Sequence, residues 1–130
     1  MLRLKFDPNL DFQIDSISSV VDLFKGQSRK PFNYTSQIIP NLLDLLKERI
    51  FENLQEIQKK NGLPLSNADD LKAPYNFTVE METGTGKTYV YLRTILELNK
   101  KYGFTKFIIV VPSVAIKEGV LKTLDITKEH

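Results

Sequence analysis

The chain has 130 residues, of which 42% are hydrophobic and 26% are charged, and its formal net charge is +2. That length allows one domain at most, and the composition indicates neither a disordered chain nor a membrane protein. The net charge is too small to indicate nucleic-acid binding, so any such function must be argued from motifs.

The sequence contains no cysteine, which excludes disulfide bonds, thiol catalysis and cysteine-bound zinc. Residues 1–8 interrupt their apolar positions with charge and proline, so they provide no core for a signal peptide. No apolar run approaches the length that spans a membrane. We therefore expect a cytoplasmic protein that makes no membrane contact.

The first half of the chain is predicted to be helical. Apolar residues at helical spacing predict a helix over 11–25 that ends at a left-handed Gly26, and a polar loop follows over 27–37. A second helix is predicted to begin near Asn41, a candidate N-cap, and to end at Lys60. Its apolar stripe favours core packing over docking of a partner, and it contains Leu42, Leu46, Ile50, Leu54 and Ile57.

The second half alternates between strand and helix patterns. After a loop over 63–74, we predict a strand over 76–81, a helix from 87 to about 101 that ends at Gly103, and a strand over 107–111. The run 107–111 is continuous and mostly β-branched, which is typical of a strand covered on both faces. Pro112 ends it, and Ser113 is a candidate cap for a last helix.

This order of strand, loop, helix, strand and helix predicts a βαβ unit with a right-handed crossover in a doubly wound α/β fold. Only two strands are visible in the sequence. Two parallel strands leave much of their apolar surface uncovered, so the predicted sheet looks incomplete.

Residues Met81 to Thr88, in the order Met-Glu-Thr-Gly-Thr-Gly-Lys-Thr, form a candidate phosphate-binding loop between the predicted strand and helix. Gly84 and Gly86 allow backbone angles in which successive N–H groups point at an anion, and the helix adds its positive N-terminal end. Lys87 would then reach the outer phosphates, and Thr88 would offer a hydroxyl to magnesium. The general pattern GxxxxGK[ST] has glycine where this chain has Met81. The alternative is a glycine turn that happens to carry Lys-Thr.

Three segments together resemble the beginning of the restriction (Res) subunit of type III restriction-modification enzymes. They are DFQIDSISSVVDLFKGQ, METGTGKTYVYLRTILELNKKYGF and FIIVVPSVAIKEGVLKTLDITKEH, at residues 11–27, 81–104 and 107–130. That family belongs to the DEAD-like, RecA-fold helicases of superfamily two. The resemblance implies an incomplete RecA-like P-loop domain. Residues 1–75 would form its helical N-terminal segment, and residues 76–130 its phosphate-loop unit.

The resemblance also implies roles for particular residues. Gln13 would read the adenine edge with its amide, which carries one donor group and one acceptor. Thr83, Gly84, Thr85 and Gly86 would hold the phosphates of ATP with Lys87 and Thr88, and Thr88 would bind Mg. Pro112 and Ser113 would contact a DNA backbone, for which the alternative is a plain helix cap. Lys117 is a weaker candidate for the same contact.

The implied partners are double-stranded DNA and the modification (Mod) methyltransferase subunit. The family hydrolyses ATP with an Asp-Glu-x-His type box, a second RecA-like domain and a separate nuclease domain, and this sequence matches none of them. Because phosphoryl transfer needs positioned metal and arginine, we expect this chain to bind ATP and hardly hydrolyse it.

Other interpretations remain open at this point. One is a truncated, inactive relic or a nucleotide-binding interaction fragment, and another is a small P-loop kinase or switch protein. Glu80 and Glu82 are expected to position the loop or face solvent rather than bind metal. His130, the last residue, is expected to have no catalytic role.

Overall fold

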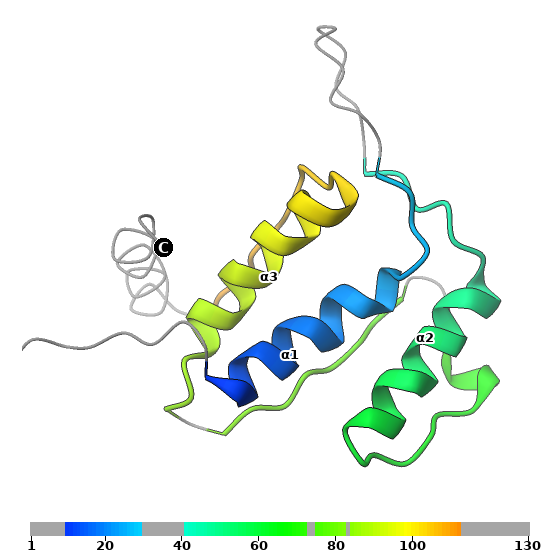
Figure 1. The fold of residues 1–130 in the computed structure, drawn as a ribbon, viewed down its shortest axis with the longest axis horizontal. Helices are drawn as coiled ribbons and strands as arrows, with labels where there is room; N and C mark the ends of the chain where they lie inside the picture. The colour runs from blue at the N-terminus through cyan, green and yellow to red at the C-terminus, as the bar shows by residue number, and fades with distance from the viewer. Residues whose placement is uncertain (1–9, 30–40, 73–74, 83, 113–130) are drawn as a thin grey trace, which may run out of the picture.

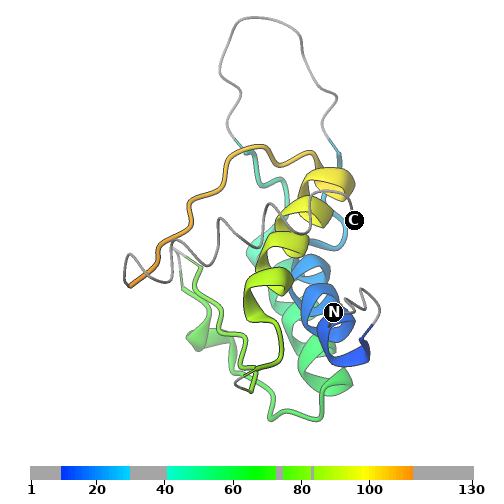
Figure 2. The same cartoon turned by 90° about the vertical axis from the view of Figure 1, so that its left-hand side faces the viewer.

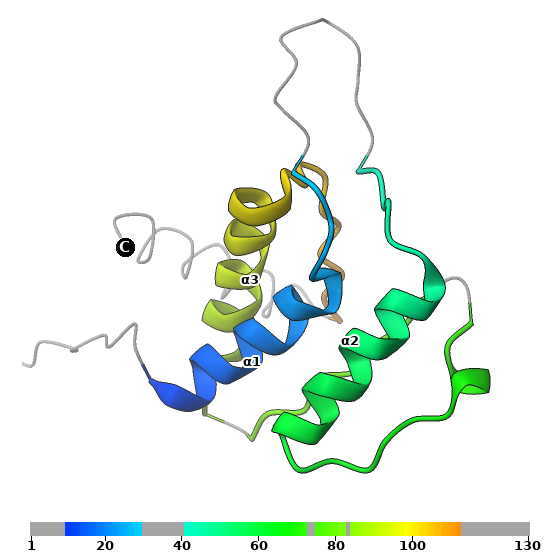
Figure 3. The same cartoon turned by 45° about the vertical axis from the view of Figure 1, so that its right-hand side comes forward.

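The computed structural model describes residues 10–29, 41–72, 75–82 and 84–112. Figure 1 shows three α-helices in this part of the chain: α1 (Asp11–Val21), α2 (Lys47–Lys60) and α3 (Lys87–Tyr102). The 3-10 turn η1 (Asp22–Phe24) extends α1, and η2 (Ala68–Asp70) interrupts the segment after α2. Helix α1 lies between the other two helices in Figures 1 and 3.

The core lies between α1 and α3. Ile17 and Val21 from α1 pack with Val90 and Leu98 from α3, and the cluster is completed by Tyr102 and Phe104. Phe24 meets Tyr102 and Phe104 edge-on, with ring centroids 6.1 Å and 5.5 Å apart. Burial of this apolar surface is the main force that holds the two helices together.

Two long-range hydrogen bonds fasten α1 to α3, one near each end. Gln13 Nε2 donates to the Thr85 carbonyl at 2.9 Å, just before α3 begins. The Tyr102 hydroxyl donates to the Val21 carbonyl at 2.8 Å, at the last residue of both helices. The two helices therefore run in the same direction.

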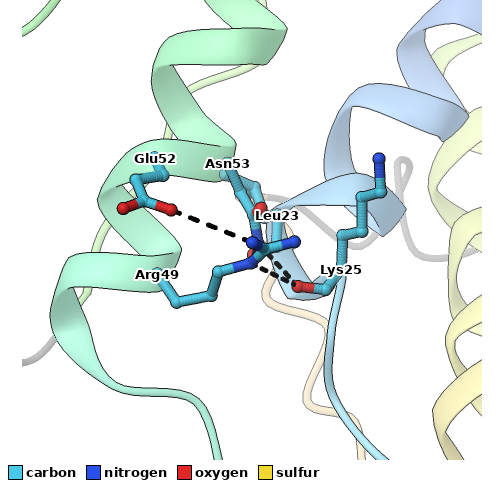
Figure 4. A network of polar contacts seen from close by, with 5 residues as sticks. All are labelled: Leu23, Lys25, Arg49, Glu52 and Asn53. Carbon is cyan, nitrogen blue, oxygen red and sulfur yellow. Dashed lines mark hydrogen bonds and ion pairs between the residues drawn. The ribbon is translucent and has the colours of Figure 1, made fainter.

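Helix α2 satisfies carbonyl groups at the end of η1, as Figure 4 shows. Asn53, which is only 2% exposed, donates from Nδ2 to the Leu23 and Lys25 carbonyls, both at 2.9 Å. Arg49 Nε also donates to the Lys25 carbonyl, at 3.4 Å. A buried carbonyl left without a donor is costly, so these bonds fix α2 against α1.

The second helix begins later than the sequence predicts. It starts at Lys47 rather than near Asn41, because the Asn41 side chain is bound to a distant segment. Asn41 Nδ2 donates to the Lys106 carbonyl at 2.7 Å, and its Oδ1 accepts from the Thr105 N–H at 2.9 Å. Of the predicted stripe, Leu42 and Leu46 therefore lie outside the helix and are exposed, whereas Ile50 is buried.

The predicted strands 76–81 and 107–111 do not form in this structure. Among the described residues neither segment is paired in a sheet, and Figure 2 shows 107–111, in orange, as an irregular stretch to the left of α3. Ile108 and Val110 are 93% and 87% exposed. A strand is stable only with neighbours that take up its N–H and C=O groups, and the described residues offer 107–111 no such neighbour.

The predictions for the first helix and for the end of α3 are confirmed. The first helix forms and leads to a left-handed Gly26, and α3 ends at Gly103, whose φ is also positive. Val90, Thr94 and Leu98 of α3 are buried. Among the described residues, no helix combines the length and apolar character that a membrane crossing requires. The predicted last helix lies outside the described residues.

Replacing Asn53 with alanine should lower the free energy of unfolding by about 1–3 kcal/mol. The Leu23 carbonyl loses its side-chain donor, and the Lys25 carbonyl keeps only the longer bond from Arg49. The measurement is urea denaturation, with Glu56→Ala as the control at an exposed position of the same helix. Equal midpoints for the two variants would show that the carbonyls are satisfied in another way.

Candidate nucleotide-binding loop

The loop before α3 has the backbone conformation that the sequence predicts. Gly84 and Gly86 have φ angles of 79° and 83°, in the left-handed region where side chains are strained. The Thr85 hydroxyl donates to the Glu82 carbonyl at 2.6 Å and closes the turn. Thr83 lies outside the described residues. Both glycine predictions are therefore confirmed as backbone geometry.

Helix α3 begins directly after the loop. Its first backbone hydrogen bond joins the Val90 N–H to the Gly86 carbonyl at 3.0 Å. The amides of Lys87 and Thr88 precede that bond, so they stand at the positive end of the helix, where an anion is stabilised. Lys87 is exposed and Thr88 is half-buried. An ammonium, a hydroxyl and backbone N–H groups at one helix start match the chemistry of a magnesium-bound phosphate chain.

Gln13 lies against this loop although it is 72 residues away from Thr85. Its side chain is 5% exposed, and Nε2 donates to the Thr85 carbonyl. In the opposite orientation of the amide, Gln13 Oε1 would face the Thr85 carbonyl oxygen, and two acceptors would meet. The bond therefore fixes Nε2 as the atom that faces the loop. Oε1 is buried and has no hydrogen-bond partner among the described residues. The structure thus supplies an unused acceptor beside the loop.

The fit between Gln13 and the loop depends on Gly86. A β-carbon at position 86 would lie 2.5 Å from Gln13 Nε2, whereas a β-carbon at position 84 would meet nothing within 4 Å. Gly86 therefore suits both the left-handed backbone angle and the present position of the Gln13 amide, which a β-carbon at residue 86 would displace. The sequence indicates only the first of these requirements.

Met81, where the general pattern has glycine, packs against the core cluster between α1 and α3 and is half-buried. Its side chain anchors the start of the loop to the body of the protein. This position therefore has a structural use that glycine cannot provide, and sequence reasoning missed it.

Of the remaining predicted residues, Glu82 is part of the loop through its carbonyl, and no described contact brings the others to the loop. Glu80 and Glu82 are exposed, and Pro112 is exposed at the end of the described residues. Ser113, Lys117 and His130 lie outside the described residues. Within the described ranges, no three His, Cys, Asp or Glu residues are grouped as metal ligands.

Sequence analysis also missed an ionic cluster one turn beyond the loop. Arg93 Nη1 donates to the Tyr89 hydroxyl at 3.0 Å, and its Nε donates to Glu97 at 3.1 Å. The hydrogen bond to Glu97 raises the pKa of Arg93. Arg93 and Glu97 line a groove of about 320 Å³ between α1 and α3. Helical spacing of four residues is the signal that could have identified this cluster.

A second groove, of about 800 Å³, lies between α1, α2 and residues 77–80. Its lining is mainly apolar and includes Phe12, Leu54, Ile57, Phe77 and Val79. Lys87 and Thr88 line neither groove, so the loop itself does not open into these two hollows.

Two alanine substitutions separate the roles of the glycines. Gly84→Ala should cost about 1–2 kcal/mol of stability from backbone strain alone. Gly86→Ala should cost that amount plus about 0.5–1.5 kcal/mol, because the new methyl group displaces the Gln13 amide from Thr85. The measurement is chemical denaturation of both variants. In a Gln13→Ala background the two costs should become equal, and a persisting difference would contradict this explanation.

Comparison with known proteins identifies the family. The family described as "Type III restriction enzyme, res subunit" matches residues 13–129. The Res subunits of the type III restriction-modification enzymes EcoPI, from Escherichia phage P1, and EcoP15I, from Escherichia coli, are each 37% identical to this chain over 96% and 95% of its length. The StyLTI Res subunit of Salmonella typhimurium is 56% identical over 42% of the chain.

The chain spans only about 13% of the length of the first two relatives and 6% of the third. The match nevertheless includes Gln13, the loop before α3 and the exposed run 107–111. The chain therefore belongs to the family of type III restriction enzyme Res subunits.

Proposed function

We propose that this chain is the ATP-binding part of a Res-type DNA-translocating motor. The observation that carries the proposal is the contact between Gln13 and a loop whose two glycines have the left-handed angles of a phosphate-binding turn. A nucleotide site needs both a phosphate cradle and a group that reads the base. Here Gln13, the candidate for reading the base, touches the candidate phosphate loop, although the two are far apart in the sequence.

In this proposal the phosphates of ATP lie at the start of α3. The backbone amides of Thr83, Gly84, Thr85 and Gly86 would surround them, and Lys87 would neutralise the outer charge. Thr88 would place its hydroxyl on Mg, which shares the phosphate charge when it is bound. Gln13 Oε1 would accept a hydrogen bond from the adenine amino group, a donor that guanine lacks at that position.

We also propose that the segments around the loop belong to a RecA-like fold. Residues 76–81 and 107–111 would become parallel strands of a RecA-like α/β sheet where neighbouring strands are available. Residues 1–75 would then be the helical N-terminal segment of the first RecA-like domain, and 76–130 its phosphate-loop unit. The support is the apolar character of 107–111, which is unusual for so exposed a surface.

In a complete Res subunit, the motor would drive cleavage of double-stranded DNA together with a Mod subunit in the cytoplasm. The relatives are named as Res subunits of type III restriction-modification enzymes, which supports this role. Pro112 and Ser113 would contact the DNA backbone.

A second candidate function is an inactive or purely interacting fragment. The exposure of Ile108 and Val110 favours it, because such a surface promotes association. Cooperative thermal unfolding of a monomeric chain would count against this alternative, and aggregation without nucleotide binding would favour it.

Lys87→Ala should weaken binding of a non-hydrolysable ATP analogue with Mg by about tenfold to a hundredfold, because a charge-assisted contact is worth about 1.5–3 kcal/mol. Lys100→Ala is the matched control: it removes the same charge from the same helix, roughly 20 Å farther along the axis. Calorimetric titration measures both affinities. Equal losses in the two variants would refute a specific phosphate contact.

Gln13→Ala should reduce the preference for adenine over guanine nucleotides without abolishing triphosphate binding. The measured quantity is the ratio of dissociation constants for matched ATP and GTP analogues. One neutral hydrogen bond corresponds to about a twofold to tenfold change in that ratio. An unchanged ratio would mean that Gln13 supports the loop and does not read the base.

A further inference from the structure

We propose that Tyr102 is a positioning residue for Gln13, and through it for the recognition of adenine. This inference rests on the proposed function. Tyr102 lies at the end of α3 away from the loop, so it touches neither the loop nor a nucleotide bound there. Its hydroxyl holds the far end of the helix that carries Gln13.

The Tyr102 contact is buried and specific. The side chain is 3% exposed, its hydroxyl donates to the Val21 carbonyl at 2.8 Å, and its ring packs against Phe24 and Phe104. Burial, helped by the charge of Asp22, raises the pKa of Tyr102 above its usual value of 10.0. The hydroxyl therefore stays protonated and remains a donor at physiological pH.

Fastening Val21 sets the position of Gln13 because both belong to one rigid helix. Eight residues separate them, which is about 12 Å along the axis of α1. The apolar contacts of Ile17 with the core are non-directional and allow small sliding movements. A hydrogen bond weakens steeply when its distance grows, so the two polar contacts determine the register of α1 on α3.

The Gln13 amide has little room to move at the loop. Gln13 Nε2 occupies the space where any residue other than glycine would place its β-carbon, and it bonds to Thr85 at 2.9 Å. The other polar tie at the far end is the Lys101–Asp22 ion pair, which is long at 3.9 Å and solvent-exposed. Exposed pairs of this kind contribute little, so the directional restraint comes from Tyr102.

The test compares Tyr102→Phe with Tyr91→Phe. Both substitutions remove one buried hydroxyl from α3, but the Tyr91 hydroxyl has no partner among the described residues. The probes are non-hydrolysable ATP and GTP analogues with Mg. We expect Tyr102→Phe to lower the adenine preference by about twofold to tenfold and Tyr91→Phe to leave it unchanged. The ratio of the two affinities is insensitive to the folded fraction, which scales both equally.

A double variant shows whether Tyr102 acts through Gln13. In a Gln13→Ala background, Tyr102→Phe should change the adenine preference no further. A further loss there would overturn the inference, as would an unchanged preference in Tyr102→Phe alone. If Gln13→Ala itself leaves the preference intact, the proposed reading of adenine fails and this inference fails with it. If Gln13→Ala lowers the preference and Tyr102→Phe does not, only the positioning role is wrong.

Hydrogen exchange of the wild-type chain tests the inference independently. This test is needed if the Tyr102→Phe variant does not fold. Linkage is reciprocal, so a base contact at Gln13 should stabilise the far end of α1. The ATP analogue should slow amide exchange over residues 18–24, and inorganic tripolyphosphate should not. Equal slowing by both ligands would overturn the inference.

Discussion

The hydrogen bond between Gln13 Nε2 and the Thr85 carbonyl is the constraint on which the candidate site depends. It joins α1 to the loop before α3, between two residues that are 72 positions apart in the sequence. It fixes the orientation of the Gln13 amide, leaves Oε1 as a buried acceptor, and requires that residue 86 have no side chain. Two features of Gln13 and one of the loop therefore follow from this one contact.

The rest of the described structure holds this contact in place. The apolar cluster presses α1 against α3, Tyr102 holds the far end of α1, and Asn53 of α2 satisfies the carbonyls where η1 ends. Met81 anchors the start of the loop to the same cluster. Helix α1 is thus restrained from both sides, which suits a residue that must place one amide accurately beside the loop.

Sequence reasoning succeeded where the cause is local. The left-handed glycines and the extent of α3 follow from glycine chemistry and helical spacing, and α3 was predicted with nearly the observed bounds. It failed where the cause is distant. Asn41 was predicted to cap a helix, but its side chain binds Thr105 and Lys106, and α2 begins at Lys47 instead. Strands 76–81 and 107–111 require partners that the described residues do not provide.

The most direct test of the account is to follow the side-chain amide of Gln13 by nuclear magnetic resonance, which is practical for a chain of 15.0 kDa. Addition of a non-hydrolysable ATP analogue with Mg should shift this amide signal strongly, because its oxygen gains a donor. The matched GTP analogue should shift it much less. A signal that moves equally with both nucleotides, or that does not move while ATP binds, would contradict the account.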